Sequence, residues 1–153
     1  MLHFIKSLFS KNQPPREDNL IESELKVISE GLLNNWKIDY QDYWFPLVEL
    51  PEHYEVLTFH VYESEIKKHE KLIIDILKKN NDFIYYVGEN GNNKYSSSEI
   101  YWILFSETFV TNSTSQWVIY TSHENTVTFS GSLFDKELLP FLKSCDITLN
   151  PWS

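Results

Sequence analysis

The sequence predicts a single α+β domain, in which an antiparallel sheet of about four or five strands carries helices mainly on one face. Three observations favour this class. Short runs rich in aromatic and β-branched residues are bounded by turn residues, and two of them flank a four-residue turn. One long segment, residues 63–79, has the apolar spacing of an amphipathic helix. A hydrophobic fraction of 42% in 153 residues is typical of one globular domain.

The first 16 residues are expected to form a leader and linker, and residues 17–153 the folded domain, because Pro14 and Pro15 make a stiff connector. A helix of about 15 residues should follow, with apolar positions at helical spacing as far as Leu32. Gly31 should weaken this helix, and the Asn34–Asn35 pair should end it.

The remaining elements follow from periodicity and turn chemistry. The predicted strands are 54–62, 83–87, 116–121 and 126–130. Further expectations are a helix at 63–79, a turn at 89–93, a polar loop at 111–115, a hairpin turn at 122–125 and a helix at 133–143. Pro140 should break the last helix or restart it as a first-turn residue.

Residues 97–106 are the least decided segment. Ser96 and Glu99 match a capping box, which favours a short buried helix, while the density of aromatic residues keeps a strand open. Trp102 in this segment and Trp117 in the next strand are expected to be core residues.

Charge and composition exclude several function classes. The net charge of −9, from 22 acidic and 13 basic residues, repels phosphate backbones, so no nucleic-acid partner is expected. Such a surface favours a basic protein partner, although it also simply keeps a protein soluble. The single cysteine excludes a multi-cysteine zinc site and agrees with a cytoplasmic location. No run of about 20 uncharged apolar residues occurs, so stable membrane insertion is not expected.

An acidic, aromatic stretch is the clearest charge anomaly, because no Lys or Arg lies between Lys37 and Lys67. Aromatic anchors ringed by carboxylates suit the binding of a basic protein. The expected contact residues are Asp39, Asp42, Tyr43, Trp44, Glu49, Glu52 and Glu55. The competing interpretation is a solvated loop whose aromatic rings pack into the core.

His123 and Glu124, at the tip of the predicted hairpin, are the candidate catalytic pair. A histidine beside a carboxylate can transfer protons or bind a metal. No helical His-Glu-x-x-His motif or Gly-framed serine supports either role, so a structural turn histidine is the favoured interpretation. No cofactor or metal site is predicted.

The segment Ser115–Gly131, with its Trp-Val-Ile-Tyr strand, Ser-His-Glu turn and Thr-Val-Thr strand, resembles a hairpin of small acidic bacterial proteins. These include immunity proteins of polymorphic and contact-dependent toxin systems. The resemblance implies a non-enzymatic protein that neutralises a basic toxin, and it carries no functional residues with it. Two alternatives stay open: a small-molecule binder with an aromatic pocket around Trp102 and Trp117, and a small enzyme using His123 and Glu124.

Overall fold

The computed structural model describes residues 18–42, 44, 58–89, 91–100 and 107–151. Their strands form one antiparallel sheet in the order β1-β4-β3-β5-β6-β7-β2. Six of the seven strands have four to six residues, and β1 has two. The predicted α+β class with an antiparallel sheet is therefore confirmed, with more strands than expected.

Each of the four predicted strands corresponds to a strand of the sheet, and the sheet contains three further short strands. Their bounds are β1 Asp18–Asn19, β2 Thr58–Tyr62, β3 Phe83–Gly88, β4 Asn93–Ser96, β5 Thr108–Thr111, β6 Val118–Thr121 and β7 Thr126–Ser130. The turn between β6 and β7 falls on residues 122–125 as predicted. Strands β1, β4 and β5 had not been predicted, and residues 54–57 of the first predicted strand lie outside the described residues.

The helices differ from the predictions mainly in where they end or divide. Their bounds are α1 Glu22–Trp36, α3 Glu63–Ile66, α4 Glu70–Asn80, α5 Ser132–Glu137 and α6 Leu139–Ser144. A 3₁₀ turn, Lys67–His69, divides the predicted 63–79 helix into α3 and α4. Pro140 restarts the chain as a first-turn residue of α6, one of the two predicted outcomes.

Two further helix predictions need correction. The Asn34–Asn35 pair does not end α1, which continues to Trp36 and ends where Lys37 adopts a left-handed conformation. In the 97–106 segment, Ser97–Glu99 is a 3₁₀ turn, and Ser96 makes no capping bond because its hydroxyl pairs with that of Ser98. Residues 101–106, including Trp102, lie outside the described part of the chain.

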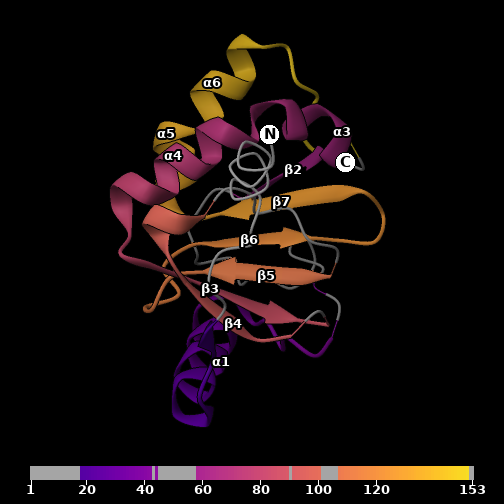
Figure 1. The fold of residues 1–153 in the computed structure, drawn as a ribbon. Helices are drawn as coiled ribbons and strands as arrows, with labels where there is room; N and C mark the ends of the chain where they lie inside the picture. Colours follow the sequence, from indigo (N-terminus) through magenta and orange to yellow (C-terminus); the bar gives the residue numbers. More distant parts are fainter. Residues whose placement is uncertain (1–17, 43, 45–57, 90, 101–106, 152–153) are drawn as a thin grey trace, which may run out of the picture.

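Apolar side chains cover both faces of the sheet. On one face, α4, α5 and α6 pack against strand residues such as Val110, Ile119 and Phe129, and Trp117 is buried here as predicted. On the other face, α1 packs Leu32 against strand side chains that include Val118. Figure 1 shows α1 apart from the other helices, so most helical cover lies on one face, as expected.

Helix α1 is held to the sheet at Ser115, in the loop between β5 and β6. The Trp36 indole N–H donates to the Ser115 carbonyl over 2.7 Å, and the Asn35 side-chain amide donates to the same oxygen over 3.0 Å. Gly31 faces the same residue, since a Cβ at Gly31 would lie 2.6 Å from the Ser115 hydroxyl oxygen. Gly31 therefore permits the close approach of α1 to the sheet, and the helix continues past it to Trp36.

The edge strand β2 is closed by the C-terminal segment. The backbone N–H of His60 donates to the Asn150 side-chain oxygen, and its carbonyl accepts from the Asn150 backbone N–H, at 2.9 and 2.8 Å. On the other side of the strand, the His60 ring Nδ1 lies 2.7 Å from the Thr128 hydroxyl of β7. Desolvation of this buried ring lowers the pKa of His60.

Replacing Gly31 with Ala should destabilise the fold, although Ala is the better helix former by about 1 kcal/mol. The new methyl group would meet Ser115, and overpacking of this kind costs about 1–3 kcal/mol. Ser115→Gly removes both clashing atoms and suits the φ of 50° at this position. Urea denaturation of the single and double variants should show Gly31→Ala rescued by Ser115→Gly, and additive losses would contradict the contact.

The fold should lose stability as the pH falls below about 6.5, the ordinary pKa of histidine. Since the folded-state pKa of His60 is lowered, the unfolded chain binds the proton more tightly. The stability contributed by neutral His60 is thus present above that pH and is lost toward the lower folded pKa. Denaturation from about pH 8 to about pH 5 should give a flatter profile for His60→Gln than for the parent or for His69→Gln.

Candidate functional site

An acidic cleft of about 130 Å³ lies where the turn that follows α1 meets the end of β3 and the start of β5. Three of its six lining residues carry carboxylates, and two are aromatic. The lining residues are Tyr40, Gln41, Asp42, Glu89, Glu107 and Phe109. Segments far apart in the sequence therefore place acidic side chains around one concavity.

A tight turn after α1 supplies one wall of the cleft. Ile38 is buried and its N–H bonds back to the Leu32 carbonyl, which fixes the direction of the chain as it leaves the helix. The Asp39 side chain then accepts the Gln41 N–H at 3.1 Å, and the Asp39 carbonyl accepts the Asp42 N–H at 3.0 Å. Both aspartates are exposed, with Asp42 at the cleft.

Glu107 supplies the buried carboxylate of the cleft, and its backbone is strained. Its φ of 49° is unusual for a residue with a long side chain and costs on the order of 1–3 kcal/mol. The neighbouring strand approaches so closely that a Cβ at Gly88 would lie 2.3 Å from the Glu107 carbonyl oxygen. Gly88 is therefore required for β3 to pass Glu107 and to present Glu89 beside it.

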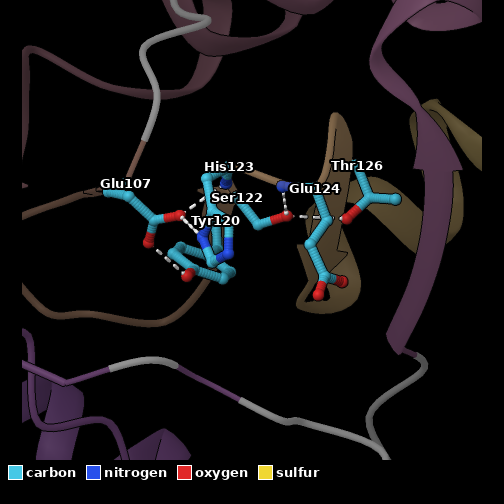
Figure 2. A network of polar contacts seen from close by, with 6 residues as sticks. All are labelled: Glu107, Tyr120, Ser122, His123, Glu124 and Thr126. Atoms are coloured by element: carbon cyan, nitrogen blue, oxygen red, sulfur yellow. Dashed lines mark hydrogen bonds and ion pairs between the residues drawn. The ribbon is translucent and has the colours of Figure 1, made fainter.

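Hydrogen bonds hold the Glu107 side chain on both of its oxygens (Figure 2). The Tyr120 hydroxyl donates to Oε2 over 2.7 Å. The other oxygen, Oε1, accepts the backbone N–H of His123 and contacts the His123 ring Nδ1. Only 9% of the Glu107 side chain is exposed, against 57% for His123, so a buried carboxylate orients a largely exposed imidazole.

Burial opposes the charged form of Glu107, but the bonds from Tyr120 and His123 outweigh it and lower the pKa of this carboxyl below its usual range. Glu107 therefore carries its charge at neutral pH. Together with Asp42 and Glu89, it gives the cleft a strongly negative potential.

The carboxylate that contacts the His123 ring is that of Glu107. Figure 2 shows the Glu124 carboxylate pointing away from the Glu107–His123 pair, and the backbone N–H of Glu124 donates instead to the Ser122 hydroxyl. That hydroxyl also bonds the Thr126 hydroxyl at 3.0 Å, so Ser122 stabilises the turn. Adjacent residues of a turn need not share partners, and a residue 16 positions away provides the carboxylate.

The predicted contact stretch is only partly within the described residues. Asp39 and Asp42 are exposed, whereas the Trp44 side chain is 4% exposed and packs edge-on against Phe109 and Tyr120. Trp44 is thus part of the core under the cleft, as the alternative interpretation held, and not a surface anchor. Tyr43, Glu49, Glu52 and Glu55 lie outside the described residues.

Sequence reasoning missed Glu89 and Glu107 as members of the site. Glu89 lies in the segment predicted as a turn, which gave no reason to pair it with Asp42. Glu107 precedes a strand that had not been predicted. The available signal was the cross-strand register, since β5 and β6 pair Thr108 with Thr121 and thereby bring Glu107 toward the hairpin turn.

The arrangement suits the recognition of a positive charge. Within the described ranges, no group of three or more His, Cys, Asp or Glu side chains is placed to hold a metal ion. The carboxylate-oriented imidazole of His123 is chemically able to relay a proton.

Among the described residues, no helix is both long enough and apolar enough to cross a bilayer.

Comparison of this chain with known protein families, curated proteins and solved structures found no match. The chemistry of the cleft is therefore inferred from the residues that line it.

Removing the Tyr120 hydroxyl should destabilise the protein at neutral pH by about 1–3 kcal/mol, because Glu107 would lose a buried charge-assisted bond. Since the folded pKa of Glu107 is lowered, its contribution is present above about pH 4.5 and is lost as the pH falls further. Chemical denaturation of Tyr120→Phe should show a larger deficit at neutral than at acidic pH. Tyr40→Phe, at a partly exposed tyrosine, is the matched control, and equal losses would contradict the role of Tyr120.

Proposed function

We propose that this protein is a non-enzymatic binding module that neutralises a basic protein, in the manner of an immunity protein and its toxin, through the acidic cleft. The observation that carries the proposal is the convergence of Asp42, Glu89 and Glu107 on one concavity. A net charge of −9 would steer a basic partner toward the chain from a distance.

The cleft fits one cationic side chain of such a partner. Its volume of about 130 Å³ is too small for most cofactors, and small-ligand pockets begin at roughly 300 Å³. A partner Arg could place its planar group between the carboxylates and against the Tyr40 ring. The exposed carboxylate of Asp39, in the same turn, would extend the contact along the rim.

The cleft is also rigid, which favours affinity because little side-chain entropy is lost on binding. Phe109 stacks on Tyr120 with ring centroids 4.5 Å apart, and Trp44 packs edge-on against both rings. This aromatic layer supports the Tyr120 hydroxyl and, through it, the Glu107 carboxylate.

The decisive experiment is capture of the tagged protein from its own cells, followed by separate expression of any stoichiometric basic partner. We expect that partner to arrest growth alone and to be harmless when co-expressed with the parent protein. Asp42→Asn with Glu89→Gln should weaken the complex by tenfold or more, since close interfacial charge pairs contribute about 1.5 kcal/mol or more each.

The matched control neutralises two exposed carboxylates elsewhere, with Glu99→Gln and Asp135→Asn, so that both variants have the same net charge. Retained binding in the control and loss in the cleft variant would support the cleft. Equal affinity in both variants would contradict it, and a captured partner that is not toxic would contradict the neutralising role.

A further inference from the structure

A second concavity, of about 320 Å³, lies between the end of α4, the start of α5 and the loop that joins β5 to β6. It is at the opposite end of β5 from Glu107, because Asn112 directly follows that strand. Four side-chain amides, one hydroxyl and an indole dominate its lining, from Asn80, Asn81, Asn112, Gln116, Ser132 and Trp117. We call this the amide groove.

Asn81 fixes the floor of the amide groove. Its side-chain oxygen accepts two hydrogen bonds, from the Trp117 indole N–H at 3.2 Å and from the Asn112 amide at 3.3 Å. Its own amide donates to the Leu77 carbonyl at 3.0 Å. The position of Asn81 is therefore determined by α4 and by both ends of the β5–β6 loop.

Asn112 fixes the loop wall in the same way. Its side-chain oxygen accepts the Gln116 backbone N–H at 3.1 Å and the Thr114 hydroxyl at 3.2 Å. These bonds shape the loop and leave the Gln116 side chain to project from it. The side chains of Gln116, Ser132 and Lys136 make no hydrogen bond to another described residue.

The lining of the amide groove carries one positive and one negative side chain, Lys136 and Glu137, in contrast with the acidic cleft. Glu137 lies 3.6 Å from Lys79 and accepts the Asn80 amide at 3.3 Å, while Lys136 adds a positive charge beside it. A ligand with a large net charge gains little here. An apolar ligand would displace water from the amides without replacing its hydrogen bonds, which is unfavourable.

We propose that the amide groove binds a neutral saccharide. Sugar hydroxyls donate and accept hydrogen bonds at short spacing, which matches the exposed Gln116 amide and Ser132 hydroxyl. The Asn81 and Asn112 amides each keep a second N–H beyond their bonds to other described residues. The volume is at the lower limit of the roughly 300–1,000 Å³ found for small-ligand pockets, a size suited to one or two sugar rings. This site is independent of the proposed binding of a basic partner, since the two concavities share no lining residue.

The test is titration of the ¹⁵N-labelled full chain with a panel of neutral mono- and disaccharides: glucose, galactose, N-acetylglucosamine, maltose and cellobiose. At least one sugar should shift the Trp117 indole N–H and the Asn81 side-chain amide saturably, with a Kd of about 1 mM or below. Gln116→Ala and Ser132→Ala change exposed side chains and should each weaken that binding by about fivefold.

The control is Gln41→Ala, which removes an exposed amide from the acidic cleft and should leave sugar binding unchanged. Two results would overturn the saccharide site. One is the absence of saturable shifts with every sugar of the panel, and the other is binding that Gln116→Ala and Ser132→Ala leave at the parent affinity.

Discussion

Every side chain of β5, β6 and β7 is buried, and this double burial requires cover on both faces of the sheet. On one face several helices share the task, whereas among the described helices α1 alone packs on the other. The contact between α1 and Ser115 is consequently central. The Trp36 and Asn35 bonds to one carbonyl, and the close approach at Gly31, keep that helix over Tyr85, Val118 and Tyr120.

The acidic cleft depends on the same packing of α1 against the sheet. The chain that leaves α1 forms the turn at Asp39–Asp42, so a helix that docks elsewhere would move one wall of the cleft away from Glu107. The aromatic layer beneath the cleft belongs to the core that α1 completes. The strained backbone of Glu107 is compensated by three groups that bind its carboxylate, so side-chain hydrogen bonding offsets a backbone cost.

The sequence was sufficient to predict an element or a buried residue where local periodicity and packing agree. The hairpin at 122–125, the helical restart at Pro140 and the burial of Trp117 all depend on neighbours in the chain. Strands β4 and β5 were missed because four-residue strands give little periodicity, and β4 is largely polar. The partner of His123 was missed because it depends on strand register, which no local pattern specifies.

The amide groove shows the same limit. Its asparagines come from the end of a helix and from a loop predicted only as polar, and only the fold brings them together. The acidic stretch, by contrast, was visible in the sequence, because no Lys or Arg lies between Lys37 and Lys67. Its two described aspartates are at the surface, but Glu89 and Glu107, which complete their site, lie next to the ends of β3 and β5.

The long-range closure of β2 has a consequence for how the chain folds during synthesis. His60 meets Thr128 across 68 positions and Asn150 across 90, so β2 is translated long before its partners exist. Contacts this distant in sequence slow folding, and the edge at His60 stays open until Asn150 has left the ribosome. A chain that stops before Asn150 would leave the His60 backbone groups exposed on a strand edge, and an open edge of this kind can pair with another copy.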